Sequence, residues 1–220
     1  MKAKICGITT AQEAEYLNES KADYAGFVLY EKSKRSITLQ SAVEVMDFLD
    51  PAIKRVAVMV SPSVSDLLLV EDAGFQILQV HKELRRELLE QASIPIWYAI
   101  SLSERRKLME AVTFLEELPK TLQSKITGIV VDGADFGDGK TFDWEQIHGE
   151  YGSLKSQIGG RQLILAGGLT PENVSEGMRL FTPDVVDVST GVEYEDLETK
   201  DTRKSPKKIK QFMGKVREYE

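Results

Sequence analysis

The chain has 220 residues, of which 42% are hydrophobic and 29% charged, the composition of a globular protein with one large core or at most two small ones. Its formal net charge of -7 argues against a nucleic-acid-binding surface, which needs a basic footprint, although a few local donors could still hold a small anion.

The N-terminus runs directly into a strand pattern, with no signal peptide before it. No apolar run approaches the roughly 18 residues that cross a membrane. A single cysteine, Cys6, provides no disulfide framework. We therefore expect a cytoplasmic protein whose partners include neither nucleic acid nor a membrane.

Short apolar runs, typical of buried strands, alternate with amphipathic helical stretches along the chain. In order, the runs cover residues 4–6, 24–29, 55–60, 75–80, 94–100, 126–131, 162–166 and 185–189. Several helical stretches follow a hydroxyl residue that can cap a helix, and these residues are Thr9, Thr38, Ser63 and Ser103. A last helix is expected from Pro206 to Tyr219.

Eight runs in 220 residues give about one strand-and-helix unit per 27 residues. This alternation predicts a parallel sheet with both faces covered, and eight units close a single (β/α)₈ TIM barrel over residues 1–220. A six-stranded doubly wound sheet is the competing architecture, but it would leave two runs unassigned. In such a barrel the active site lies at the C-terminal ends of the strands.

Several residues with useful chemistry follow the expected strand ends. In chain order they are Cys6, Arg35, His81, Asp132, Gly167, Gly168, Ser189, Thr190 and Gly191. Asp132 enters a glycine-rich loop at 134–140, ahead of an expected helix start at 141–144, and a lone acid there is a candidate for proton transfer. The alternative is that Asp132 caps a turn, because Asp-Gly is a common turn dipeptide.

A phosphate site is expected where two loops follow the last strands. Gly167 and Gly168 allow a ligand to approach the backbone, and a helix with Pro171 at its first position would offer free amides and a favourable dipole. Residues 189–191 add two hydroxyls and another glycine in the loop where this fold commonly binds phosphate. The alternative for the two glycines is a tight turn.

The other candidates also have plain structural alternatives. Cys6 could be an inert small hydrophobe, although its place at the first strand end favours a chemical role. Arg35 could belong to a solvated basic stretch with Lys32 and Lys34. His81 and His148, with no second cysteine, form no metal constellation.

Five segments in order resemble phosphoribosylanthranilate isomerase: residues 4–9, 26–30 with 33–35, 139–144, 165–173 and 186–193. The resemblance implies a (β/α)₈ barrel of tryptophan biosynthesis that needs no cofactor or metal. It also implies an Amadori rearrangement of N-(5-phosphoribosyl)anthranilate to 1-(2-carboxyphenylamino)-1-deoxyribulose 5-phosphate. A small-molecule substrate is the expected partner, and a monomer and a homodimer both remain open.

Carried over by motif, the resemblance implies that Cys6 is the general base and Asp132 the general acid. Arg35 would face the anthranilate carboxylate and His81 would line the substrate pocket. A free cysteine has a pKa of about 8.5, so the surroundings must favour the Cys6 thiolate, or the thiolate acts as a minority species.

The sequence departs from the family pattern near three of these positions. Lys82 follows His81 where the family usually has glycine, and Lys34 precedes Arg35 where it has proline. The loop after Asp132 is short, and Asp138 adds a negative charge to it. These changes leave the acid and the base in place and concern substrate fit. The acidic stretch 193–201 is expected to be a solvated loop before the last helix.

Two rival functions share these features. Another barrel enzyme, such as a different sugar-phosphate isomerase or indole-glycerol-phosphate synthase, would share the diglycine site but would not be expected to combine Cys6 with Asp132, and the synthase needs catalytic lysines at strand ends. A phosphate-binding barrel that has lost catalysis is the rival from a different class. The presence of Cys6, Arg35 and Asp132 together favours an enzyme.

Overall fold

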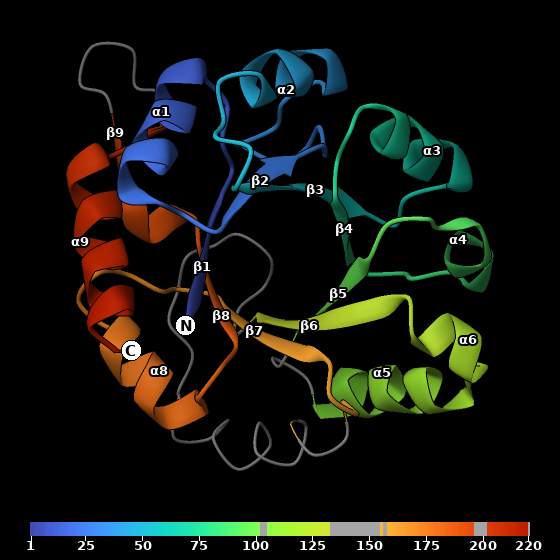
Figure 1. Ribbon diagram of the computed structural model, residues 1–220. Helices are drawn as coiled ribbons and strands as arrows, with labels where there is room; N and C mark the ends of the chain where they lie inside the picture. Colours follow the sequence, from blue (N-terminus) through green and yellow to red (C-terminus); the bar gives the residue numbers. More distant parts are fainter. Residues whose placement is uncertain (102–104, 133–154, 156–157, 196–201, 220) are drawn as a thin grey trace.

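The computed structural model describes residues 1–101, 105–132, 155, 158–195 and 202–219, and eight parallel strands close into a barrel within them. Strand order follows the sequence around the barrel, and the first strand pairs with the last (Figure 1). The expected barrel is therefore confirmed, and the six-stranded alternative is wrong.

Each expected apolar run overlaps one strand of the barrel. The strands are β1 (Lys2–Cys6), β2 (Tyr24–Val28), β3 (Lys54–Val60), β4 (Ile77–His81), β5 (Ile96–Ser101), β6 (Ile126–Asp132), β7 (Gln162–Ala166) and β8 (Val185–Val188). They are rich in β-branched and apolar residues on both parities, because one face meets the barrel interior and the other meets the helices.

Helices cover the outside of the barrel. They are α1 (Ala11–Ser20), α2 (Leu39–Met46), α3 (Val64–Asp72), α4 (Arg86–Gln91), α5 (Arg105–Glu117), α6 (Lys120–Gln123), α8 (Val174–Phe181) and α9 (Pro206–Glu218). Helix α9 packs beside both α1 and α8, so the last helix and the first are neighbours in the outer ring (Figure 1).

The expected helix starts are confirmed at two positions and wrong at a third. Thr38 caps α2, and Ser63 caps α3 in a capping box with Asp66. Helix α1 is capped by Thr10 rather than Thr9, because the Thr9 amide and hydroxyl both donate to the Glu13 carboxylate. Two further expected starts, at Ser103 and at 141–144, lie outside the described residues.

The helix expected from Pro171 begins later, at Val174. Asn173 shapes the intervening turn: its Oδ1 accepts a hydrogen bond from the Thr170 amide at 2.7 Å, and its Nδ2 donates to the Gly168 carbonyl at 2.9 Å. The asparagine side chain thus braces the diglycine loop from within.

The start of the acidic stretch is not the solvated loop that the sequence suggested. Glu193–Glu195 forms a short strand, β9, which pairs antiparallel with β10 (Thr202–Lys204). Glu193 itself is buried, with a side chain 5% exposed. The rest of the stretch, 196–201, lies outside the described residues.

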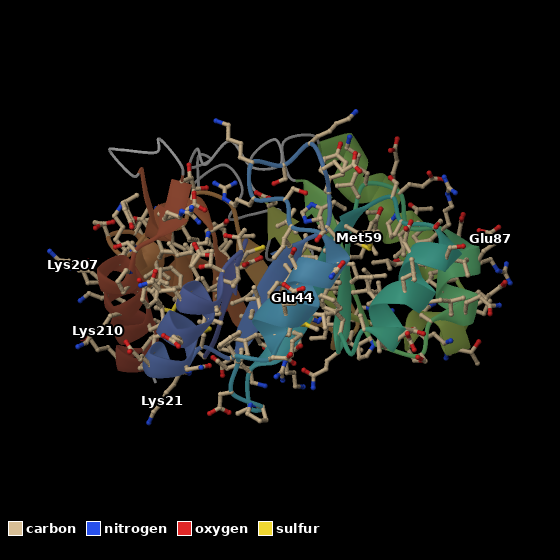
Figure 2. All side chains as sticks on the ribbon, turned by 90° about the horizontal axis from the view of Figure 1, so that it is seen from above. Lys21, Glu44, Met59, Glu87, Lys207 and Lys210 are labelled. Atoms are coloured by element: carbon tan, nitrogen blue, oxygen red, sulfur yellow. The ribbon has the colours of Figure 1, made fainter. Side chains whose placement is uncertain are left out.

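Two apolar layers surround the strands. The larger lies between strands and helices, and the smaller fills the barrel interior around Tyr24 and Trp97, whose rings meet edge to face at 4.9 Å. Gly128 makes room for this packing, since a Cβ there would lie 2.6 Å from Trp97 Cδ1. Long charged side chains, including Lys207 and Lys210, point outward from the helices (Figure 2).

In the described part of the chain, no helix is both long and apolar enough to cross a membrane.

Candidate active site

A cavity of about 920 Å³ opens at the C-terminal ends of the barrel strands. All the residues predicted from the sequence line it, and they are Cys6, Arg35, His81, Asp132, Gly167, Gly168, Ser189, Thr190 and Gly191. The fold therefore brings together residues that lie up to 185 positions apart, from Cys6 to Gly191. His148 and Asp138 lie outside the described residues.

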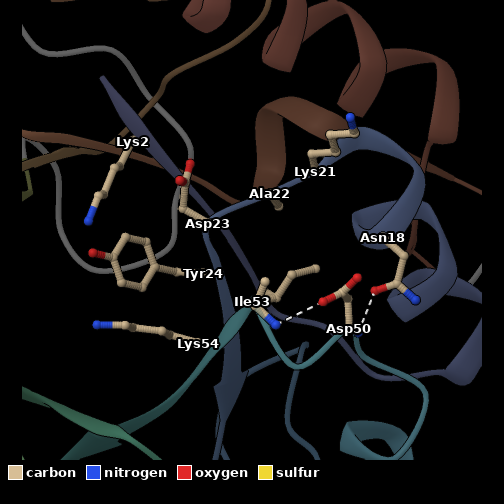
Figure 3. Close-up of a pocket in the computed structure, with 10 residues that line it drawn as sticks. Lys2, Asn18, Lys21, Ala22, Asp23, Tyr24, Asp50, Ile53 and Lys54 are labelled. Atoms are coloured by element: carbon tan, nitrogen blue, oxygen red, sulfur yellow. Dashed lines mark hydrogen bonds between the residues drawn. The ribbon is translucent and has the colours of Figure 1, made fainter.

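A second cavity, of about 390 Å³, lies at the opposite end of the barrel, where β1, β2 and β3 begin (Figure 3). Its polar groups serve the chain connections: the Asp50 amide donates to Asn18 Oδ1, and Asp23 accepts from the Ala3 amide and from Arg217. This end of a barrel usually contributes to stability rather than to chemistry.

The floor of the active-site cavity contains a buried ion pair. Lys4 Nζ donates to Asp187 Oδ2 at 2.7 Å, with the lysine side chain fully buried and the aspartate 7% exposed. Lys4 lies two residues before Cys6 on β1, so both side chains point into the barrel. A Cβ at Gly26 would lie 2.8 Å from Cys6 Sγ and 3.0 Å from Lys4 Cε, so only glycine leaves room for this arrangement.

Opposing effects act on the Cys6 thiol. Burial raises its pKa most strongly, the positive charge of Lys4 lowers it, and Asp187 raises it again. The net result is a raised pKa, so the thiolate is a minority species at neutral pH. The sequence left two possibilities open for Cys6, and the structure favours a thiolate that acts as a minority species.

The neighbouring Lys4 stays charged. Burial lowers the pKa of Lys4, but the charges of Asp187 and Cys6 outweigh this effect, so the pKa of Lys4 is raised.

Asp132 and His81 lie at the ends of β6 and β4 respectively and line the same cavity. The Asp132 side chain is half-buried. Burial, and then the charge of Lys4, lowers the pKa of His81 to about 3, so His81 is neutral near physiological pH. Its Nε2 lies 2.9 Å from Gln79 Nε2, within hydrogen-bond distance. A neutral imidazole can line the pocket, but it brings no positive charge that would attract an anion.

Arg35 is held in a network and does not belong to a solvated basic stretch. Its Nε and Nη2 both donate to the Glu193 carboxylate, the second at 2.8 Å, and Lys204 Nζ donates to Glu193 Oε1 at 2.6 Å. The Arg35 side chain lies across Gly7, where a Cβ would come within 2.6 Å of its Cδ. Arg35 and Lys204 thus converge on one carboxylate beside the cavity.

The two loops expected to bind phosphate lie against each other. Gly167 and Gly168 have φ of 86° and 65°, a left-handed backbone that favours glycine. A Cβ at Gly191 would fall 1.9 Å from the Leu169 carbonyl oxygen, so glycine alone permits the contact between the loops. The Ser189 hydroxyl donates to the Cys6 carbonyl at 3.0 Å. Its single hydrogen is therefore directed at the protein, and a contribution of Ser189 to anion binding would come from its backbone amide.

Five polar residues of the site escaped the sequence analysis, namely Lys4, Gln79, Asp187, Glu193 and Lys204. For the first three, a signal was present in the sequence. Each interrupts an apolar strand two positions before a strand-end residue: Lys4 before Cys6, Gln79 before His81, and Asp187 before Ser189. Alternate residues of a strand share a face, so these side chains had to point into the barrel. Among the described residues, no group of three or more His, Cys, Asp and Glu side chains could hold a metal ion.

Comparison with known proteins shows the family of the chain. The family model of N-(5'-phosphoribosyl)anthranilate isomerase matches residues 3–215. The isomerase of Thermoanaerobacter sp. (strain X514) is 35% identical over 223 residues, covering 99% of this chain and 98% of the relative.

Two solved structures have the same fold. The crystal structure of phosphoribosyl anthranilate isomerase from Thermotoga maritima has a TM-score of 0.80 and 32% identity, with 99% of each chain covered. A structure of such an isomerase in complex with reduced 1-(o-carboxyphenylamino)-1-deoxyribulose 5-phosphate has a TM-score of 0.77 and 31% identity, also with 99% of each chain covered. The match over nearly its whole length shows that this chain belongs to the N-(5'-phosphoribosyl)anthranilate isomerase family.

Proposed function

We propose that Cys6 and Asp132 are the general base and the general acid with which this chain carries out the isomerisation of its family, the Amadori rearrangement of N-(5'-phosphoribosyl)anthranilate in tryptophan biosynthesis. The observation that supports these roles is the meeting of Cys6, Asp132 and Arg35 with the diglycine loop around one cavity. A cavity of about 920 Å³ lies within the usual size range of small-molecule sites.

The chemistry needs one acid and one base. Asp132 donates a proton to the ring oxygen of the ribose, and the ring opens to an iminium. Cys6 then removes a proton from carbon 2, which gives an enolamine. The enolamine becomes the ketone when carbon 1 gains a proton and the hydroxyl on carbon 2 loses one, so product and substrate are isomers.

The charges around the cavity fit the two anionic ends of the substrate. Arg35 uses two of its five N–H groups for Glu193, and its other edge could pair with the anthranilate carboxylate. The phosphate would lie at the two packed loops around Gly168 and Gly191, where glycines bring the backbone close to a ligand. A ligand with a carboxylate at one end and a phosphate at the other also occupies the related structure in complex with the reduced product.

The test is Asp132→Asn. The amide keeps the shape of the side chain but cannot donate a proton to the ring oxygen, so we expect kcat to fall by roughly 100- to 10,000-fold. Turnover is followed by loss of anthranilate fluorescence with freshly prepared substrate. Asp184→Asn is the matched control, because Asp184 directly precedes β8, at the end of the barrel away from the cavity, and is exposed.

Near-normal turnover of Asp132→Asn would show that Asp132 only caps its turn, since asparagine serves well in that role. Wild-type protein without any isomerase activity would instead favour the binding barrel that has lost catalysis. The same assay thus separates the proposed function from both alternatives.

A further inference from the structure

One carboxylate oxygen in the active-site cavity has no partner among the residues that the structure describes. It is Asp187 Oδ1, in the middle of β8. The other oxygen, Oδ2, accepts a hydrogen bond from Lys4 Nζ at 2.7 Å, and the side chain is only 7% exposed. Asp187 also lines the cavity, so the residue that carries this buried oxygen borders the space that a ligand would fill.

The chemistry of this oxygen limits what can satisfy it. An ionised carboxylate only accepts hydrogen bonds, so the missing partner must be a donor. Buried acceptors in native proteins are normally satisfied by protein, ordered water or ligand, because leaving one unpaired is unfavourable. Gln79 Oε1 is a second buried acceptor of the same cavity without a partner in the described structure. Two such acceptors in one cavity suit a ligand that carries several hydroxyl groups.

The position of Asp187 relative to Cys6 indicates which hydroxyl group of the ligand would bind to Asp187. Cys6 Sγ and Lys4 Cε both lie against Gly26, and Lys4 joins them to Asp187. The negative charge of Asp187 is also close enough to raise the pKa of Cys6. A substrate carbon within reach of Cys6 therefore places its own hydroxyl near Asp187.

Resting on the function proposed above, we propose that Asp187 accepts a hydrogen bond from the hydroxyl on carbon 2 of the sugar, the carbon that Cys6 deprotonates. Lys4 positions Asp187 by binding its other oxygen. Asp187 is then a substrate-binding residue of the reaction, and Lys4 a positioning residue.

This contact fits the last step of the rearrangement. The enolamine becomes the ketone when the hydroxyl on carbon 2 loses its proton, the carbon–oxygen bond becomes double, and carbon 1 gains a proton. A carboxylate that accepts the hydrogen bond of that hydroxyl draws its proton away and favours the flow of electrons from oxygen towards carbon 1. The same contact would select substrates with a hydroxyl at this position.

The test compares two ligands by calorimetry: reduced 1-(o-carboxyphenylamino)-1-deoxyribulose 5-phosphate, and the same molecule with hydrogen in place of the hydroxyl on carbon 2. The wild type should bind the first roughly 10- to 100-fold more tightly, as expected for a hydrogen bond to a charged group. Asp187→Ala should lose most of this preference.

Asp187→Ala leaves the buried Lys4 without its counter-ion, so a second variant guards against a folding failure. Lys4→Met combined with Asp187→Leu replaces the pair by apolar side chains, an exchange that is often neutral for stability. This double variant should bind both ligands within about threefold of each other. Asp184→Asn, the control at the residue that precedes the same strand, should keep the wild-type preference.

A preference that survives in the folded double variant would overturn the proposal. A wild type that binds the two ligands equally would also overturn it, and would assign Asp187 Oδ1 to an ordered water. Both results leave the proposed function intact as long as the wild type binds the first ligand and isomerises its substrate. A wild type that does neither refutes the proposed function itself.

Discussion

At the scale of single residues, Cys6 shows how the surroundings decide the chemistry of a group. Burial disfavours the thiolate, while the ammonium of Lys4 favours it. Burial prevails, so the pKa of the thiol is raised and most molecules carry the neutral thiol at pH 7. The proposed base is then a thiolate present in a small fraction of the enzyme, rather than a permanently ionised group.

This balance predicts how the reactivity of Cys6 depends on pH. Below the pKa of the thiol, the thiolate fraction rises tenfold per pH unit, so the rate of Cys6 alkylation by iodoacetamide should rise about tenfold per unit from pH 6 to 8, with no plateau below the usual cysteine pKa of about 8.5. The rate is measured by mass spectrometry of the alkylated protein. Cys6→Ser, almost the same size but a far weaker base, should be nearly inactive and keep its affinity for the reduced product. Ordinary activity in the serine variant would assign the base to another residue, and a flat alkylation profile would contradict the raised pKa of the thiol.

At the scale of elements, the β9–β10 hairpin connects the substrate site to the end of the chain. Glu193 on β9 takes hydrogen bonds from Arg35 and from Lys204 on β10. Burial raises the pKa of Glu193, but the two cations outweigh it and the net pKa is lowered, so the carboxylate stays ionised. The Lys204 amide in turn donates to Glu13 on α1 at 2.9 Å. A short hairpin thus orients Arg35 towards the cavity.

Glu193→Gln should therefore destabilise the protein and loosen Arg35. One anion fewer leaves two cations facing each other in a largely buried place, and breaking such a network costs about 3 kcal/mol of unfolding free energy. Urea denaturation measures this loss. KM should rise, because Arg35 is no longer oriented for the anthranilate carboxylate, whereas Glu218→Gln, on an exposed helix end, should match the wild type in both assays. Unchanged stability and KM in Glu193→Gln would contradict the positioning role.

The ion pairs of Glu193 with Arg35 and Lys204 also stabilise the folded protein to a degree that depends on pH. Since the folded-state pKa of Glu193 lies below its unfolded value, the stabilisation is present above the unfolded pKa of about 4.3. It is lost as the pH falls through the folded-state pKa. The difference in unfolding free energy between wild type and Glu193→Gln should accordingly shrink in acid.

At the scale of the whole molecule, the barrel interior has two levels: a packed apolar level around Trp97, and the polar cavity at the C-terminal ends of the strands. Trp97 is fully buried and fills the interior beside Gly128. Lys4 and Cys6, both from β1, lead from this packed region to the open cavity. Stability and chemistry therefore share the same strands but use different levels of the barrel.

This division predicts that Gly128→Ala affects stability and leaves the chemistry in place. The added Cβ would lie 2.6 Å from Trp97 Cδ1 and 2.7 Å from Ile164 Cδ1, and a closed interior has no room to relax. We expect a loss of about 1–3 kcal/mol in unfolding free energy, measured by urea denaturation with tryptophan fluorescence. Gly214→Ala on α9 is the control, because nothing lies within 4 Å of its added Cβ, and it should be neutral or stabilising. Equal stability of the two variants would show that the interior is loosely packed.

The sequence by itself determined the alternation of strands and helices, and hence the barrel, because burial on both faces dictates apolar strands. It also determined which residues meet at the barrel mouth, since parallel strands place their C-terminal ends on one side. The motifs around Cys6, Arg35, Gly168 and Ser189, with the segment 139–144, indicated the family. Helix starts were less certain, and α1 and α8 begin one to three residues from the expected positions because the Glu13 and Asn173 side chains compete for the local hydrogen bonds.

Only the tertiary structure decided which charges face one another. The pairs Lys4–Asp187 and Arg35–Glu193 join residues 183 and 158 positions apart, so no local pattern could reveal them. Glu193 belonged to an acidic run that is typically solvated, and it is buried only because two cations from distant segments surround it. The pKa of Cys6 likewise depends on burial and on Lys4, which are properties of the closed barrel. Local physics determines strands and their ends, whereas the electrostatics of the site arises from contacts that exist only after the barrel has closed.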